Sequence, residues 1–218
     1  MTAVPIRILL TGFEPFGKAP YNPSGDVAKA LQGRSLSVAT SLGTRNATVM
    51  CRILPVEWVT AALQVQEHLA SLQPHIAIST GMGKDAFEVE QVADDERLTL
   101  IDNLGNLPSS PRAVASVKYA TALPWPAIER AVVAAGGPIK ASRDAGGFIC
   151  EQVFLALMQV YRRQGTSRRL LRAGFIHVPN DEFVPSVVSR AVVEAAILGA
   201  IETTVRDLTP AEAAPTQP

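Results

Sequence analysis

Short apolar runs alternate with segments of helical periodicity along most of this chain. The first run, residues 6–10, lies near the N-terminus and ends in Thr11-Gly12. Further apolar runs follow at 47–56, 75–79, 139–142 and 173–179, and helical patterns cover 22–31, 58–72, 124–135, 153–161 and 182–205. Strands that alternate with helices typically build a parallel sheet that is covered on both faces. We therefore predict an α/β fold, a three-layer α/β/α sandwich with a mixed, mainly parallel central sheet.

The composition restricts the class of protein and the kind of partner. The chain has 218 residues, of which 47% are apolar and 18% charged, so it has enough apolar residues for a large core. We expect one domain over residues 1–208 and a flexible tail at 209–218. The charges balance at 20 against 20, which argues against nucleic acid as a partner. No apolar run reaches membrane-spanning length, and two cysteines are too few for a disulfide framework. We expect a cytoplasmic protein without a membrane partner.

A turn of small residues precedes Cys150. Ala145, Gly146 and Gly147 allow the backbone to turn tightly, and Cys150 then falls in the first turn of a predicted helix. The unpaired N–H groups and the positive end of the helix dipole favour a thiolate at that position. A buried apolar cysteine is the alternative interpretation of this stretch, and Cys51, in a predicted strand, fits that alternative.

His177 lies inside an otherwise apolar run that ends at Pro179. An imidazole in such a strand needs a hydrogen-bonding partner, and a nearby thiolate would make a Cys–His pair. An acidic residue could orient the imidazole, and alternation in residues 87–93 sends Glu88 and Glu90 to the same side of a strand. The residues alone do not show whether Glu90, Glu88, Asp94 or Asp95 is the acid that orients the imidazole. Metal binding is disfavoured because no His-x-x-x-His or paired-cysteine spacing exists.

Phe13 and Phe16 lie in the segment that follows the first predicted strand. Ligands bind at the carboxyl ends of strands in open α/β sheets. The two rings are either a hydrophobic staple under the loop or an aromatic wall for a small apolar ligand.

Four stretches together resemble the pyroglutamyl peptidase I family of cysteine peptidases. They are LLTGFEPFG (9–17) with Asn22-Pro23-Ser24, EQVA (90–93) with Asp102-Asn103-Leu104-Gly105, SRDAGGFIC (142–150) and AGFIHVP (173–179). The resemblance covers the chain to about residue 205. It implies a Cys–His–Glu triad of Cys150, His177 and Glu90, and an apolar slot formed by Phe13, Phe16 and Phe148. It also implies a substrate-binding or oxyanion role for Arg97.

The expected reaction is hydrolysis of the bond after an N-terminal pyroglutamyl residue, with peptides as substrates and no cofactor or metal. The resemblance further implies a homo-oligomer, a dimer or tetramer. Several positions depart from the family pattern, namely Gln91, Arg143, Asp144, Gly147, Glu151 and Gln152. These changes concern rate and substrate preference. They leave two alternative hypotheses: another small cysteine amidase, or a weakly active or non-catalytic relative that binds a small lactam or amide.

Overall fold

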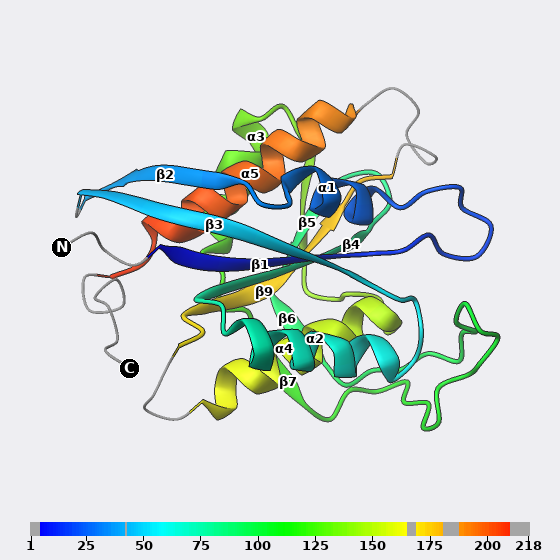
Figure 1. The fold of residues 1–218 in the computed structure, drawn as a ribbon. Coiled ribbons are helices and arrows are strands. Elements are labelled where there is room, and N and C mark those ends of the chain that lie inside the picture. Colours follow the sequence, from blue (N-terminus) through cyan, green and yellow to red (C-terminus); the bar gives the residue numbers. More distant parts are fainter. Residues whose placement is uncertain (1–4, 42, 165–168, 181–187, 210–218) are drawn as a thin grey trace.

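The computed structural model describes residues 5–41, 43–164, 169–180 and 188–209. Within them the chain forms nine strands and five helices (Figure 1). The strands are β1 (Ile6–Phe13), β2 (Ser35–Thr40), β3 (Gly43–Leu54), β4 (Ile76–Met82), β5 (Phe87–Glu90), β6 (Val92–Asp94), β7 (Lys118–Ala120), β8 (Ile139–Ser142) and β9 (Arg172–Val178). The helices are α1 (Pro23–Leu31), α2 (Thr60–Leu72), α3 (Trp125–Ala134), α4 (Ile149–Arg163) and α5 (Arg190–Arg206).

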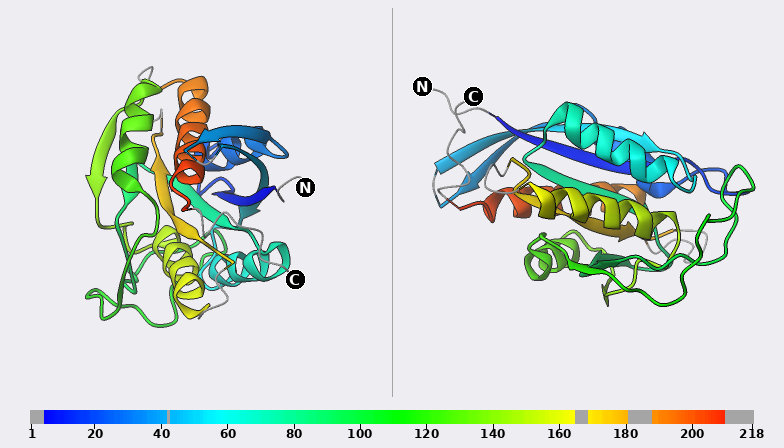
Figure 2. Two further views of the ribbon diagram at one scale, coloured as in Figure 1. Left: turned by 90° about the vertical axis from the view of Figure 1, so that its left-hand side faces the viewer. Right: turned by 90° about the horizontal axis from the view of Figure 1, so that it is seen from below.

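Seven strands make the central sheet, in the order β2-β3-β1-β4-β9-β5-β8. Neighbours pair in parallel except β2 with β3 and β5 with β9, which are antiparallel. Helices α1, α3 and α5 cover one face, and α2 and α4 cover the other (Figures 1 and 2). A small sheet of β6 and β7 packs beside α4. The predicted three-layer α/β/α sandwich with a mixed, mainly parallel sheet is confirmed.

The junction between β1 and α1 fixes the first part of the site. Asn22 caps α1, its side chain accepting a hydrogen bond from the Ser24 backbone N–H at 3.1 Å, and Pro23 occupies the first helical turn. The Ser24 hydroxyl accepts a hydrogen bond from the Phe13 backbone N–H at 3.1 Å. A Cβ atom at Gly12 would collide with the Ser24 carbonyl, so this close approach requires glycine.

The structure corrects several predicted boundaries. Phe13 is the last residue of β1, where a loop residue was expected. The predicted strand at 87–93 is divided at Gln91 into β5 and β6. Strand β2, which pairs with β3 in a hairpin, was not among the predicted strands. Helix α5 is capped by Ser189, whose side chain accepts from the Val192 N–H. The predicted start of that helix at 182 lies outside the described residues.

Two expectations about the whole chain stay predictions. The first is that residues 1–208 form a single domain. The second is that the tail at 209–218 is flexible, and this segment lies outside the described residues except for Thr209. In the part of the chain that the structure describes, no helix combines the length and the apolar character needed to cross a membrane.

Candidate active site

Cys150 occupies the first turn of α4, directly after the glycine turn. Gly146 and Gly147 have φ values of 90° and 59°, a left-handed conformation that L side chains rarely adopt. Helix α4 begins at Ile149, so the partly exposed Cys150 belongs to the first turn, whose N–H groups have no partner within the helix. On the neighbouring strand β4, a Cβ at Gly81 would lie 2.8 Å from the Cys150 sulfur. The absence of a side chain at Gly81 therefore makes room for the thiol.

Glu90 and His177 form a buried hydrogen-bonded pair. The Nδ1 atom of His177 lies 2.8 Å from Oε1 of Glu90, whose side chain is wholly buried. The other carboxylate oxygen, Oε2, accepts a hydrogen bond from the Ser142 hydroxyl at 2.6 Å. Both oxygens of Glu90 therefore have partners, as a buried carboxylate requires. A carboxylate that accepts from Nδ1–H leaves Nε2 as the ring nitrogen available for chemistry.

The electrostatics of His177 reflect two acidic neighbours. Burial by itself would lower the pKa of His177, because desolvation disfavours the imidazolium. Hydrogen bonds with Cys150 and Glu90, and the negative charges of both groups, outweigh burial and raise the pKa above its ordinary value. An imidazolium beside the sulfur favours the thiolate form of a cysteine. Cys150, His177 and Glu90 therefore form a hydrogen-bonded series with the imidazole in the middle.

Glu90 reaches His177 from an antiparallel strand. Strand β5 runs opposite to β9, with Glu88 in register with His177. Glu88 and Glu90 share one side of β5, as the alternation predicted. Ligand atoms of Glu88, Glu90 and His177 lie within 4.8 Å of one another, which makes this group the candidate metal site among the described residues. A cation there would compete with the hydrogen bond between Glu90 and His177.

The three predicted phenylalanines line one cavity with Cys150. Phe13, Phe16 and Phe148 surround a hollow of about 70 Å³. The ring of Phe148 stacks obliquely on Phe16, at a centroid distance of 5.2 Å, and edge-on against Trp58 at 5.1 Å. Of the two interpretations of the phenylalanines, an aromatic wall facing a cavity agrees with this arrangement.

The loop at 102–106 holds the segment that carries Phe16. Asp102 accepts hydrogen bonds from the backbone N–H groups of Trp58, Leu104 and Asn106. The side chain of Asn103 accepts from the Gly17 N–H at 3.0 Å and donates to the Pro15 carbonyl at 2.9 Å. The Asp-Asn pair therefore positions one wall of the aromatic cavity.

Arg97 lies apart from the cavity that Cys150 lines. It lines a neighbouring hollow with Trp58, Leu63 and Gln152. Its buried Nε atom has no hydrogen-bonding partner among the described residues. A contact between Arg97 and substrate therefore stays a prediction.

Glu151 is a site-forming residue that the sequence analysis did not assign. Its buried carboxyl accepts hydrogen bonds from the backbone N–H groups of Asp94, at 2.7 Å, and Ala145, at 3.1 Å. Burial raises the pKa of Glu151 to about 8, against the opposite effect of these two donors. This side chain links the turn before Cys150 to the strand β6 that follows Glu90. The sequence feature that could have identified Glu151 is its position directly after Cys150, where the chain departs from the family pattern.

Comparisons with known proteins agree with this geometry. A family model described as pyroglutamyl peptidase matches residues 6–216. The chain belongs to the pyroglutamyl peptidase family. It is 36% identical over 180 residues to a pyrrolidone-carboxylate peptidase of Pseudomonas fluorescens (strain SBW25), covering 79% of this chain and 78% of that protein. A pyrrolidone-carboxylate peptidase of Cupriavidus taiwanensis is 35% identical over 208 residues, which cover 92% of this chain and 88% of the relative.

Solved structures of the same family have the same fold. The crystal structure of pyroglutamyl peptidase I from Bacillus amyloliquefaciens superposes with a TM-score of 0.78 at 27% identity, covering 91% of this chain and 96% of that one. A mutant pyrrolidone carboxyl peptidase from the hyperthermophile Pyrococcus furiosus gives 0.79 at 28% identity, covering 94% of this chain and 100% of that one. The predicted family resemblance is confirmed.

The two cysteines should differ sharply in alkylation. Burial raises the pKa of Cys51 to about 12, so that almost no thiolate forms there at neutral pH. We expect iodoacetamide at about pH 6.5, near the ordinary pKa of histidine, to modify the native protein once, at Cys150, as measured by intact mass and peptide mapping. The Cys150→Ser variant, as the control, should remain unmodified under the same conditions. Labelling of Cys51 in the native wild-type protein would contradict this assignment.

Proposed function

We propose that this protein is a cysteine peptidase that hydrolyses the bond after an N-terminal pyroglutamyl residue of peptides. The observation that most strongly supports this proposal is the buried pair of Glu90 and His177, in which His177 is also hydrogen-bonded to Cys150 beside an aromatic cavity. A nucleophile, a base and a group that orients the base are the three parts that acyl transfer requires. Family membership supports the choice of substrate.

In the proposed mechanism the Cys150 sulfur attacks the carbonyl carbon that joins pyroglutamate to the next residue. The negative charge moves to the carbonyl oxygen, where N–H groups at the start of α4 can stabilise it. As the C–N bond breaks, His177 donates its proton to the leaving amine and a thioester remains on Cys150. Water then attacks the thioester with His177 as base, releasing pyroglutamate and the thiol. Glu90 keeps the imidazole oriented throughout.

The aromatic cavity suits a small lactam ring. Pyroglutamate has no charged amine, so its site needs an apolar slot and a few hydrogen bonds in place of a carboxylate. The walls formed by Phe13, Phe16 and Phe148 provide apolar surface next to the sulfur. A site that hydrogen-bonds the lactam carbonyl would reject prolyl substrates, because its polar groups would be left unpaired.

Glu90 and Glu88 form a matched pair for testing the triad. With a fluorogenic pyroglutamyl amide, we expect Glu90→Gln to lower kcat by about 10²–10⁴-fold, since it removes the charge that stabilises the imidazolium. Cys150→Ser should abolish turnover. Glu88→Gln changes a carboxylate on the same side of the same strand, and we expect it to change kcat by less than about threefold, as for a residue outside the chemical step.

Three results would contradict parts of the proposed function. A Glu88→Gln variant as impaired as Glu90→Gln would remove the distinction between the two acids. Equal turnover of prolyl and pyroglutamyl amides would contradict the lactam slot. Tight pyroglutamyl-amide binding without turnover by the wild-type protein would instead favour a non-catalytic relative.

We also propose that the protein acts as a homo-oligomer in the reducing cytoplasm. Several large apolar side chains of the segment after β6 are exposed, among them Ile101, Leu104 and Leu107, which are 60%, 66% and 52% exposed. A second copy of the chain would cover such a surface. A thiol nucleophile is kept reduced in the cytoplasm.

Sedimentation velocity tests the assembly. We expect a dimer or tetramer for the wild-type protein, and a shift toward monomer for a Leu104→Glu variant, because a charge on a buried interface is unfavourable. A monomeric wild-type protein at micromolar concentration would contradict the proposed oligomer.

A further inference from the structure

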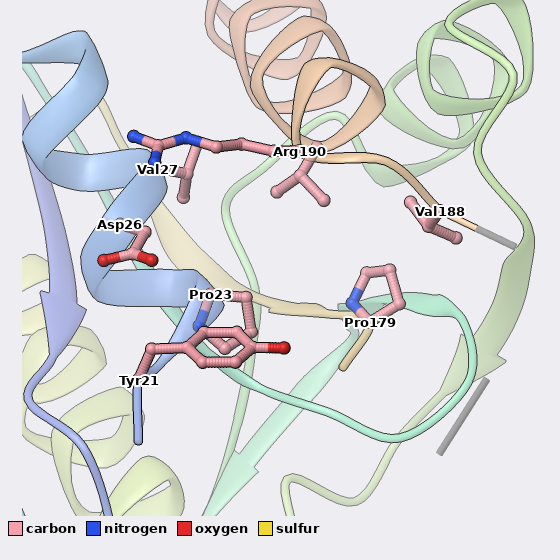
Figure 3. Close-up of a pocket in the computed structure, with 8 residues that line it drawn as sticks. Tyr21, Pro23, Asp26, Val27, Pro179, Val188 and Arg190 are labelled. Atoms are coloured by element: carbon pink, nitrogen blue, oxygen red, sulfur yellow. The ribbon is translucent and has the colours of Figure 1, made fainter. Parts of the chain in front are cut away.

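A cavity larger than the one beside Cys150 lies between α1 and α5, at the same edge of the sheet (Figure 3). Its volume is about 300 Å³. Its apolar walls come from Tyr21, Pro23, Val27, Pro179, Val188 and Val193. The Tyr21 ring extends across it toward Pro179 (Figure 3). This volume reaches the lower end of the range for small-molecule sites, about 300 Å³.

This cavity and the cavity of Cys150 are lined by neighbouring residues of the chain. Asn22 lines the Cys150 cavity, whereas its chain neighbours Tyr21 and Pro23 line the larger one. A second pair of neighbours separates the cavities at the ends of β4 and β9. Met82, the last residue of β4, lines the Cys150 cavity and accepts a hydrogen bond from Asn180, just after β9, at 3.3 Å. Pro179, the residue before Asn180, lines the larger cavity.

A pyroglutamyl peptide needs a surface beyond the Cys150 cavity. That cavity, at about 70 Å³, is small enough that the second and later residues of a substrate must lie outside it. The leaving nitrogen must meet His177, which protonates it, so the downstream peptide starts on the His177 side of the sulfur. Pro179 follows His177 by two residues at the exit of β9, and this exit leads to the larger cavity.

The hollow lined by Arg97 lies on the other side. It is bounded by Trp58, whose ring packs against Phe148 of the Cys150 cavity. Trp58 follows β3, which is separated in the sheet from the His177 strand β9 by β1 and β4. A peptide that leaves from His177 would have to cross the ring site to reach it. The geometry therefore favours the cavity between α1 and α5 over this one.

We propose that the cavity between α1 and α5 is the subsite for the peptide downstream of pyroglutamate. This inference rests on the proposed peptidase function. The floor of Val27 and Val193 takes an apolar side chain of the leaving peptide. Asp26 and Arg190 supply the charged groups of its lining, and Arg190 is also paired with Glu194 at 2.9 Å. The chemical class of ligand is an extended peptide with an apolar residue near the cleaved bond.

Two substrates with the same acyl group separate this subsite from the chemistry. Pyroglutamyl-glycine amide has a compact leaving group without a side chain, whereas pyroglutamyl-leucyl-alanyl-alanine amide extends into the subsite. We expect Val188→Trp, which fills the partly exposed mouth of the cavity, to lower kcat/KM for the tetrapeptide by about tenfold through KM. Turnover of the glycine amide should stay unchanged, which also shows that the variant is folded. Tyr21→Ala, which removes a wall, should produce the same selective loss to a smaller degree.

Leu63→Trp is the matched control, because it fills the hollow lined by Arg97 and should not lower tetrapeptide turnover selectively. Unchanged tetrapeptide kinetics in both Val188→Trp and Tyr21→Ala, with normal wild-type turnover, would overturn the subsite and leave the proposed function intact. A selective loss in Leu63→Trp would overturn it too, by assigning the peptide to the other hollow. Absence of turnover of either substrate by the wild-type protein would overturn the proposed function, and the subsite with it.

Discussion

The hydrogen bond between Glu90 and His177 is the interaction on which the site depends. A wholly buried carboxylate is costly unless both oxygens are satisfied, and here an imidazole and the Ser142 hydroxyl satisfy them. Strands β9 and β8 supply these two partners, one on each side of β5. Because β5 lies between β9 and β8 in the sheet, Glu90 reaches a hydrogen-bond donor on each neighbouring strand.

Placement of the nucleophile depends on a second set of contacts, between the turn before α4 and residues 94–98. Glu151 accepts from the Asp94 N–H, the Gln152 side chain donates to the Glu96 carbonyl at 3.0 Å, and the Gly147 carbonyl accepts from the Leu98 N–H at 2.8 Å. These contacts tie the Cys150 turn to the chain that continues from Glu90. The acid and the thiol are thus positioned by one connected segment.

Local signals predicted much of this arrangement. Asn22-Pro23 gave the correct start of α1 because capping depends on adjacent residues, and the types of Cys150 and His177 indicated their chemistry. The partner of His177 could not be derived without the family resemblance, because alternation puts Glu88 and Glu90 on the same side and strand direction is a tertiary property. The position of Arg97, the break at Gln91 and the space left by Gly81 likewise depend on distant contacts.

Titration of the three histidines tests the central pair most directly. Burial lowers the pKa of His68 and of His75, whereas the acidic neighbours of His177 raise its pKa above the ordinary value of 6.5. With 15N-labelled imidazoles followed by NMR, we predict that His177 alone stays protonated well above the ordinary value of 6.5. The Glu90→Gln variant should lower its pKa, because the stabilising charge is lost. A His177 that titrates below that ordinary value, or that does not respond to Glu90→Gln, would contradict the account.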